Sequence, residues 1–553
     1  MPATLIDYLR IALYSALVVI VVALFQTWER EHPVKQVQQS LSSTLSNTVL
    51  PTNITANTNI ISPSTSSITT IPNKLIHVTT DVFQITIDPK GGNIVGLNLL
   101  KYPAMLHSTL PTVLMSNDPA QKYIAQSGLY SQAGPDTTQG EALFTTDQTD
   151  YTLADNQTTT EVRLHWRNAF GVTFTKIYTF HRNDYAIDVN YEIDNASSKA
   201  WNGSLYLQLL RKNLPSAQHS GMLGLSTFNG AAFSSPDKPF QKLTFAKMDK
   251  EPLDENIANG WVAMMQHYFL SAWVPPTDTT ARYFTRTSDD GLYSIGMIAP
   301  AISVNPGEKI TTGAKLYAGP EVVDQLQKVA PTLKLTIDYG WLWMISAALF
   351  WLMQKIYNVV GNWGWSIVIV TMLIKLAFYH LSAKSYRSMS ALKKLQPKIE
   401  ALKERLGDDR QQLTQATLEL YRKEKVNPMS GCLPVLIQIP VFIALYWVLI
   451  ESVQLRQSPF ILWIHDLSVS DPYYILPVLM GLSMFLQQRL NPPPADPTQA
   501  KIMMFMPVVF TVMFAGFPAG LMLYWFVNNT LSFLQQWFIM HRMEKAENNR
   551  KAK

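Results

Sequence analysis

The sequence predicts a polytopic α-helical membrane protein with six transmembrane helices, a large all-β domain outside the cytoplasm, and a cytoplasmic helical hairpin. Three observations lead to this fold class. Long apolar runs lie near the N-terminus and again after residue 340, and the stretch between them alternates polar and apolar residues. Of 553 residues, 47% are hydrophobic and 15% are charged, and the mean hydropathy is +0.03. Such an average fits a membrane part joined to a large water-exposed part.

The N-terminal element, residues 1–28, contains an uninterrupted apolar run over 11–28. A cleaved signal peptide is the alternative, but no small-residue cleavage site follows the run. We therefore expect an uncleaved transmembrane anchor with a cytoplasmic N-terminus. Residues 29–74 are rich in Ser, Thr, Asn and Pro and carry few charges. Such a composition cannot bury enough apolar surface to fold, and it predicts a disordered linker.

Residues 75–325 have the pattern of an antiparallel β sandwich. "DVFQITID", "VTFTKIYTF" and "YAIDVNYEI" alternate with period two, and "PKGG" and "HRND" supply turns between such runs. The histidines are scattered without metal-ligand spacing, which favours structural roles over a catalytic site. Cys432 is the single cysteine of the chain, so this domain must fold without an intrachain disulfide.

The chain becomes membrane-like from residue 340. Within 326–362, the run "WLWMISAALFWLM" is 13 residues long with three tryptophans, which suits an interfacial amphipathic helix better than a span. Five further spans are predicted at 363–382, 432–451, 473–490, 501–517 and 518–539. The connections are an outer loop at 452–472, a cytoplasmic loop at 491–500 and a basic cytoplasmic tail at 540–553.

The cytoplasmic segment 383–431 carries eleven Lys and Arg against six Asp and Glu. The positive-inside rule therefore places it, and both chain ends, in the cytoplasm. Its leucines and isoleucine repeat at three and four residues from Leu392 to Leu406, and "GDD" breaks the pattern. The pattern predicts a short antiparallel helical hairpin in water. A solvated connector and a docking surface for cytoplasmic partners are both open, and the apolar seam favours the docking surface.

Lys375 lies inside the apolar run 366–381, where a charged side chain costs about 2.5–3.5 kcal/mol on insertion scales. On one continuous helix Thr371, Lys375 and Tyr379 share a face. Snorkelling of the amine to the membrane surface is the alternative, but the distance is long for one lysine. A charged lysine at this depth requires local water.

Other spans are polar too. Gln438 lies between two prolines, and Tyr524, Asn528, Ser532 and Gln535 form a stripe along the last span. Hydrogen bonds between helices would explain these residues, as would a shared wet cavity, and the presence of Lys375 favours the cavity. The five spans predicted after residue 340 contain no Asp or Glu apart from Glu451, which lies at the end of one of them. This counts against a proton-coupled transporter, and no nucleophile-and-base pair indicates an enzyme.

Six stretches of the sequence match a known family, namely "GNWGWSIVIVTMLIK", "LQPKIEALKERLGDD", "YRKEKVNPMSGCLPVLIQIPVFIALYW", "LRQSPFILWIHDLS", "DPYYILP" and "FPAGLMLYWFVNN". They resemble the YidC/Oxa/Alb family of membrane protein insertases, in its Gram-negative YidC form. The resemblance implies a five-helix insertase core with a hydrophilic groove, a periplasmic β-supersandwich similar to galactose mutarotase, and an inner-membrane location. It also implies cooperation with the Sec translocon.

On this basis we expect no enzymatic chemistry, cofactor or metal. The candidate groove residues are Lys375, Thr371, Tyr379, Gln438, Tyr524, Trp525, Asn528 and Ser532. The expected partners are nascent membrane proteins, Sec translocon components and the lipid bilayer. The ribosome and the signal recognition particle receptor are candidate partners of the hairpin and the basic tail.

The sequence departs from the family at two positions. Lys375 stands where the family usually has Arg, which keeps the charge and loses the planar fork. His380 stands where Pro is common. Two other functions remain open at this point, namely a transporter with an intramembrane binding cavity and a carbohydrate-binding outer domain on a membrane stalk.

Overall fold

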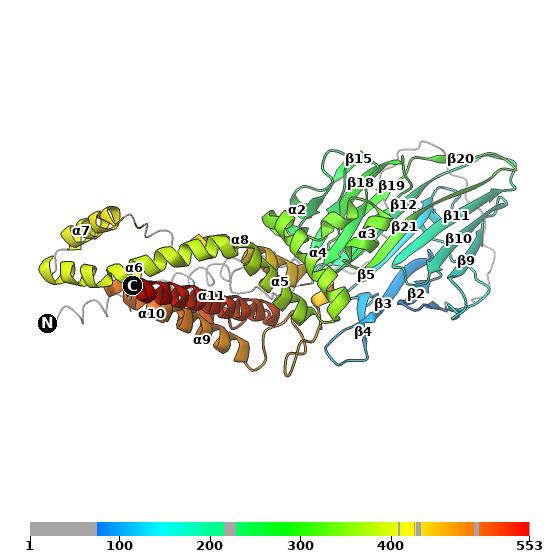
Figure 1. The fold of residues 1–553 in the computed structure, drawn as a ribbon. Helices are drawn as coiled ribbons and strands as arrows, with labels where there is room; N and C mark the ends of the chain where they lie inside the picture. The colour runs from blue at the N-terminus through cyan, green and yellow to red at the C-terminus, as the bar shows by residue number, and fades with distance from the viewer. Residues whose placement is uncertain are drawn as a thin grey trace. The chain divides into compact units, whose positions relative to one another are not determined.

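The computed structural model describes residues 74–214, 228–406, 410–424, 426, 433–491 and 497–551. The expected anchor at 1–28, Cys432, and the linker 29–74 except its last residue lie outside the described residues. Within these limits the chain forms two β-sheets followed by a set of helices (Figure 1).

The first sheet has 13 strands. Its main path runs through β15 (Asp254–Ala258), β18 (Thr280–Thr287), β19 (Leu292–Ile298), β12 (Trp201–Lys212), β5 (Tyr123–Tyr130), β3 (Asn93–Pro103), β2 (Phe83–Asp88), β1 (Ile76–Thr79) and β8 (Asp150–Thr152). Branching from this path are β4 (Pro111–Met115), β6 (Asp136–Thr137), β7 (Gly140–Glu141) and β20 (Ile302–Val304).

The second sheet has eight strands. In spatial order they are β14 (Gln241–Leu243), β13 (Gly230–Phe233), β16 (Val262–Gln266), β17 (Phe269–Val274), β21 (Lys309–Pro320), β11 (Ala186–Asn195), β10 (Val172–His181) and β9 (Thr159–Arg167). All neighbours in this sheet pair antiparallel. The predicted antiparallel β domain is therefore present as two sheets, with parallel pairing only at β1–β8 and β5–β6 among the described strands.

The period-two pattern of the sequence explains which side chains form the core. In β2 and β11, alternate residues are buried and their neighbours are more exposed. Trp261 and Trp273 are among the largest fully buried side chains, and Trp273 Nε1 donates to Gln208 O of the other sheet at 3.1 Å. The apolar faces of the two sheets thus pack on each other, as in a sandwich.

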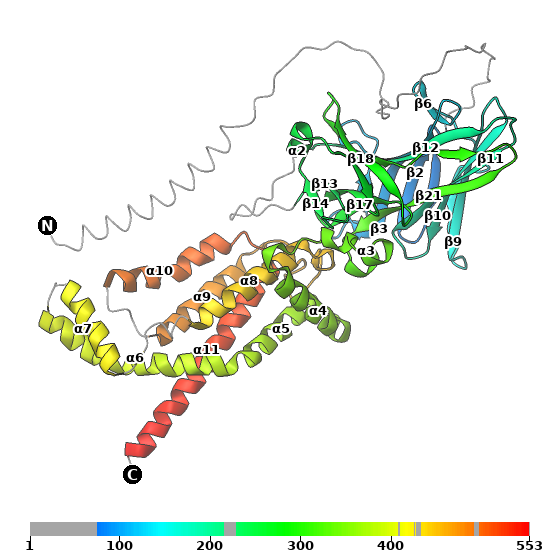
Figure 2. The same cartoon turned by 90° about the horizontal axis from the view of Figure 1, so that it is seen from above.

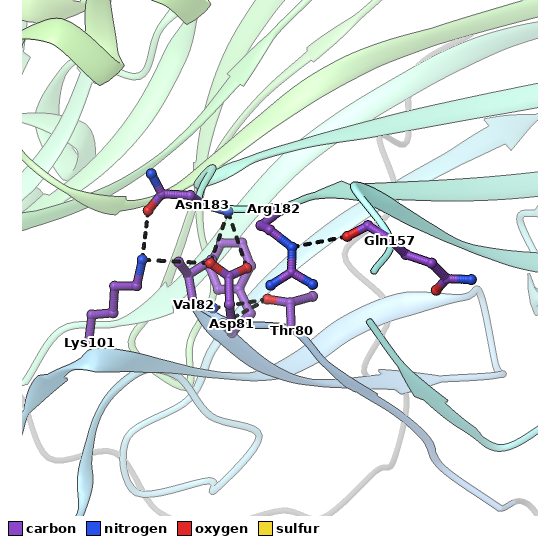
Figure 3. A network of polar contacts seen from close by, with 8 residues as sticks. Thr80, Asp81, Val82, Lys101, Gln157, Arg182 and Asn183 are labelled. Carbon is purple, nitrogen blue, oxygen red and sulfur yellow. Dashed lines mark hydrogen bonds and ion pairs between the residues drawn. The ribbon is translucent and has the colours of Figure 1, made fainter. Parts of the chain in front are cut away.

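A polar network ties the β1–β2 turn of one sheet to the β10–β11 turn of the other (Figure 3). The backbone N–H of Asn183, a residue in the left-handed conformation at φ 58°, donates to both carboxylate oxygens of Asp81. Lys101 of β3 donates to Asn183 Oδ1 at 2.6 Å and lies 3.6 Å from Asp81. Since three elements share these bonds, the network fixes one end of β3 relative to the second sheet.

The helices are α2 (Phe245–Lys250), α3 (Val323–Val329), α4 (Trp343–Val360), α5 (Trp363–Ala377), α6 (Tyr379–Leu406), α7 (Arg410–Lys423), α8 (Leu433–Glu451), α9 (Ile475–Leu490), α10 (Pro497–Phe514) and α11 (Ala519–Lys551). Short 3₁₀ turns are η1 (Leu333–Thr336), η2 (Gly340–Leu342) and η4 (Val453–Leu455). Helix α11 packs against α5, α6 and α9, and α7 lies beside α6 (Figure 2).

Helix α4 is amphipathic. Its Ser346 hydroxyl donates to Ala444 O of α8, and Leu349 and Met353 lie on the same buried face. Trp343 and Trp351 project from the other side and are 60% and 62% exposed. The helix ends at Gly361, whose φ of 69° suits a glycine C-cap.

The segment expected as one span over 363–382 forms two helices in the structure. Phe378 takes the C-cap position at φ −92° and ψ 11°, which interrupts the helical geometry between α5 and α6. Among the described residues, no single helix is both long and apolar enough to cross a membrane, whereas the pair Trp363–Ala377 and Tyr379–Lys394, bent by 67°, meets these criteria together.

Candidate functional site in the helical region

Lys375 is held inside the helical region by a neutral partner. Its side chain on α5 is 8% exposed, and Nζ donates a 2.6 Å hydrogen bond to Ser532 Oγ of α11. The Ser532 hydroxyl donates in turn to Asn528 O at 2.7 Å. In the part of the chain that the structure describes, no ion pair links Lys375 to a carboxylate. The amine therefore keeps hydrogen-bonding capacity that a substrate could use.

The polar track continues from α11 to α8. Asn528 is 8% exposed, and its Nδ2 donates to Gln438 Oε1 at 3.1 Å. Lys375, Ser532, Asn528 and Gln438 thus form one series of hydrogen-bonded residues from three helices, which we call the polar track. Residues four apart on α11 supply its centre, because they lie above one another on a helix face.

A cavity of about 360 Å³ adjoins this track between α8, α9, α10 and α11. Four of the eight predicted groove residues, Gln438, Tyr524, Trp525 and Asn528, line it. The rest of its wall combines amides with apolar side chains, including Gln487, Gln488, Asn491, Asn529, Met484, Met503, Met506 and Phe510. Amides both donate and accept hydrogen bonds, so this wall matches the groups of a polypeptide backbone.

Aromatic packing shapes one side of the cavity. Trp525 contacts Phe442 of α8 with ring centroids 4.6 Å apart and Phe514 of α10 at 4.7 Å. Tyr524 is 2% exposed, and its ring lies 6.4 Å from that of Phe442. These edge-on and tilted contacts hold α8, α10 and α11 together at one end of the cavity.

The structure places the remaining two predicted residues in neither the polar track nor the cavity wall. Thr371 is buried, but its hydroxyl donates to Ile367 O within its own helix at 2.6 Å. Tyr379 follows the break at Phe378, is 38% exposed, and contacts the His380 ring. The expected shared face of Thr371, Lys375 and Tyr379 requires one continuous helix, and the bend separates Tyr379 from it.

Sequence reasoning missed a second set of polar contacts, which join α11 to α9 and to the C-cap residue of α9. Asn529 Nδ2 donates to Ser483 Oγ at 3.3 Å, and Gln536 Nε2 donates to Asn491 Oδ1 at 3.0 Å. Asn529 and Gln536 are seven residues apart, which is two helical turns. Each of the two residues directly follows a member of the predicted stripe, Asn528 or Gln535. Their spacing along α11 is the signal that could have revealed them.

Family models match almost the whole described chain. The YidC periplasmic domain model matches residues 75–352, and the model described as 60Kd inner membrane protein matches 355–547. A membrane protein insertase YidC from Coxiella burnetii is 46% identical over 563 residues, which cover 99% of each chain. The protein of that name from Pseudomonas putida is 49% identical, over 88% of this chain and 87% of its own.

This chain belongs to the YidC family of membrane protein insertases. The resemblance indicated by the sequence motifs is thereby confirmed, and the insertase function is favoured over the transporter and carbohydrate-binding alternatives. A crystal structure described as an active YidC insertase with its first transmembrane domain resolved matches at 20% identity and a TM-score of 0.40, covering 84% of this chain and 92% of its own.

Family membership also locates the two parts of the chain. The two-sheet domain corresponds to the periplasmic domain of the family, and the helical part corresponds to the inner membrane protein model. The insertases of this family are not enzymes. Among the described residues, no group of three or more His, Cys, Asp or Glu side chains could hold a metal ion.

Proposed function

We propose that this protein inserts nascent inner-membrane proteins by receiving a polar segment of the substrate at Lys375 and along the polar track. The observation that carries the proposal is the bond from Lys375 to a neutral hydroxyl instead of a carboxylate. An unpaired cation attracts acidic or polar segments, and the amide-lined cavity beside it offers partners to a backbone that leaves water. A polar site inside the membrane shortens the stretch of lipid hydrocarbon that such a segment must cross without hydrogen-bond partners.

The apolar segment of the substrate would leave along the exposed faces of α8 and α10. On α10, apolar side chains point outward over several turns, and Val512 is 71% exposed, Val508 62% and Phe505 58%. Ile439 of α8 is 46% exposed. In a bilayer these faces contact lipid tails, so an emerging transmembrane segment can replace lipid there without uncovering polar groups.

In the proposed topology six spans cross the inner membrane, both termini are cytoplasmic, and 452–472 faces the periplasm. The eleven Lys and Arg of 383–431 support this orientation. The segment pairs α6 with α7, and Lys398 Nζ bonds Glu424 Oε1 at 2.6 Å. We assign to it, and to the basic tail, contact with the ribosome and the signal recognition particle receptor, and we assign cooperation with the Sec translocon to the membrane part.

The decisive experiment reconstitutes the purified full chain, without other proteins, in liposomes of inner-membrane composition. Insertion of a single-span substrate with a short outer segment is measured by protease protection, and substrates with acidic and neutral outer segments are compared. We expect insertion above the rate in empty liposomes and faster insertion of the acidic substrate. Equal rates with and without the protein would overturn the proposal.

A further inference from the structure

The turn between β3 and β4 presents apolar side chains to the outside. We call residues 104–110 the β3–β4 tip. Met105 is 70% exposed, Leu110 is 66% exposed, and Val113 at the adjoining strand is 55% exposed. The sequence from Pro103 to Met115 contains no Asp, Glu, Lys or Arg. Large exposed apolar side chains on a turn whose own sequence carries no charge indicate a surface that contacts something other than water.

The β3–β4 tip is held in one conformation. Ala104 N donates to Leu110 O at 2.8 Å, and Ser108 N donates to Met105 O at 3.1 Å. His107 takes a left-handed conformation at φ 60°. At the base of the hairpin, Lys101 is fixed by the network with Asp81 and Asn183 (Figure 3). The apolar side chains are therefore displayed by an ordered turn.

The loop between α8 and α9 is bonded directly to this turn. Arg456 Nη2 donates to Pro103 O at 2.8 Å and to Ala104 O at 3.1 Å, and Gln457 Nε2 donates to Pro103 O at 3.2 Å. The His107 and His465 rings meet edge to face at 5.5 Å. These contacts hold the β3–β4 tip beside the loop between α8 and α9.

The loop presents a second apolar turn of the same kind. Leu462, at φ 57°, is 77% exposed, and Ile461 is 44% exposed. Phe460 N donates to Ile464 O at 2.9 Å and closes this turn. Residues 457–465 also contain no Asp, Glu, Lys or Arg. Two exposed apolar turns are thus linked through the hydrogen bonds that Arg456 and Gln457 donate to Pro103 and Ala104.

We propose that the β3–β4 tip inserts Met105 and Leu110 into the outer-leaflet interface of the bilayer beside Ile461 and Leu462, and so anchors the periplasmic domain to lipid. The inference rests on the proposed topology, in which the loop joins two spans at the periplasmic surface. A turn bonded to that loop lies at the depth of the lipid headgroups. Apolar side chains without charges suit this region, and the exposed tryptophans of α4 have the same chemistry.

The test takes advantage of the fact that Cys432 is the single cysteine of the sequence, so its replacement leaves no other thiol to be labelled. In a Cys432→Ser background, Met105→Cys and Phe170→Cys are labelled with an environment-sensitive fluorophore. The two sites are matched, because Met105 is 70% and Phe170 69% exposed and both belong to the β domain. The full chain is placed in nanodiscs that hold one copy each, with or without lipids that carry a nitroxide quencher near the headgroup.

We expect a blue-shifted emission and strong quenching by the nitroxide lipids at position 105, and water-like, unquenched emission at position 170. Water-like emission at both positions would overturn the proposal. Shielding of position 105 only in native membranes would identify a protein partner, and shielding only at several copies per vesicle would identify a second copy; either result also overturns it.

A variant that places carboxylates on the β3–β4 tip gives an independent test. Met105→Glu combined with Leu110→Glu should remove the quenching of a label at Leu462→Cys or reduce it several-fold, whereas Phe170→Glu should leave it unchanged. Insertion activity of the same samples separates the two proposals. An active protein with an unquenched tip disproves only the lipid anchor, and a quenched tip in a protein without insertion activity disproves only the proposed function.

Discussion

Lys375 and Ser532 lie 157 positions apart in the sequence, yet Nζ of the lysine donates a 2.6 Å hydrogen bond to the serine hydroxyl. A hydroxyl satisfies one of the three donors of the ammonium group and does not neutralise its charge. Burying such a charge without a counter-ion costs stability. The site therefore keeps an attraction for acidic or polar groups at the expense of helix packing.

Substitutions of Lys375 test whether its charge speeds insertion while it lowers the stability of the protein. Lys375→Arg should be tolerated, because it restores a cation. Lys375→Leu should slow insertion of substrates with acidic outer segments by about tenfold, which corresponds to about 1.4 kcal/mol of barrier, and it should raise the thermal stability of the protein. Insertion of these substrates by Lys375→Glu should be slower still, since a negative charge at this site repels acidic segments. Protease protection and Tm are measured on the same preparations, with exposed Lys355→Leu as the control. A Leu variant with the parental insertion rate would contradict the role of the charge.

The cytoplasmic hairpin should be required although it lies outside the membrane. Ala383 and Tyr386 of α6 pack against Ile539 of α11, so the replacement should spare these turns. We expect that exchanging 391–424 for a Gly/Ser linker leaves a folded protein that cannot complement loss of the insertase in cells. A linker variant that restores full growth would show that this segment is only a connector, and membrane levels of the variant are the control.

Most of the β domain should be dispensable for insertion of simple substrates, because the polar track lies entirely on α5, α8 and α11. A deletion of about 80–300 that keeps α4 should retain activity toward a single-span substrate in liposomes. The deletion removes the bond from His267 Nε2 to Ile450 O, so the stability of the helical part is measured beside activity. Loss of all insertion in a stable deletion variant would refute the expectation.

Glu321 should make the stability of the protein depend on pH. Burial raises the pKa of its carboxyl well above the usual value, and the Glu451 carboxylate raises it further. A raised folded pKa gives a contribution to stability that is complete below the unfolded pKa and is lost as the pH rises through the folded pKa. Glu321→Gln should therefore match the parent in acid and exceed it at neutral or higher pH, by about 1–3 kcal/mol.

Thermal unfolding of the full chain in detergent across this pH range measures the effect of Glu321→Gln. Exposed Glu255→Gln is the matched control and should not change the pH profile. A parallel loss or gain at every pH would contradict the titration of Glu321.

Lys176 should stabilise the interior of the β domain. It is 0% exposed and donates to Gly91 O at 3.1 Å and Ser127 O at 2.8 Å, while the buried carboxyl group of Asp136 accepts from Leu129 N. Burial lowers the pKa of Lys176 below its usual value, and Asp136 and Glu141 counteract part of this shift. Lys176→Met should lower the free energy of unfolding by about 1–3 kcal/mol, since it leaves the buried Gly91 and Ser127 carbonyl oxygens without their donor. Exposed Lys238→Met is the control, and equal Tm values for the two variants would contradict this role.

The sequence alone determined the features that depend on local periodicity. Alternation with period two placed the strands and their buried faces, and apolar runs placed the helices that follow α4. Spacing of four residues aligned Tyr524, Asn528 and Ser532 on α11, and the cost of a buried charge singled out Lys375. Each of these inferences depends only on residues that are close in the sequence, within two helical turns or a few strand positions.

The tertiary structure decided which side chains meet. Ser532 is the partner of Lys375 because α5 and α11 pack together with a particular rotation about their axes, which no local repeat encodes. The interruption at Phe378 moved Tyr379 away from Lys375, and the α9–α11 contact paired Asn529 with Ser483. Local periodicity fixes the face of a helix, but only the packing of distant segments fixes what that face touches.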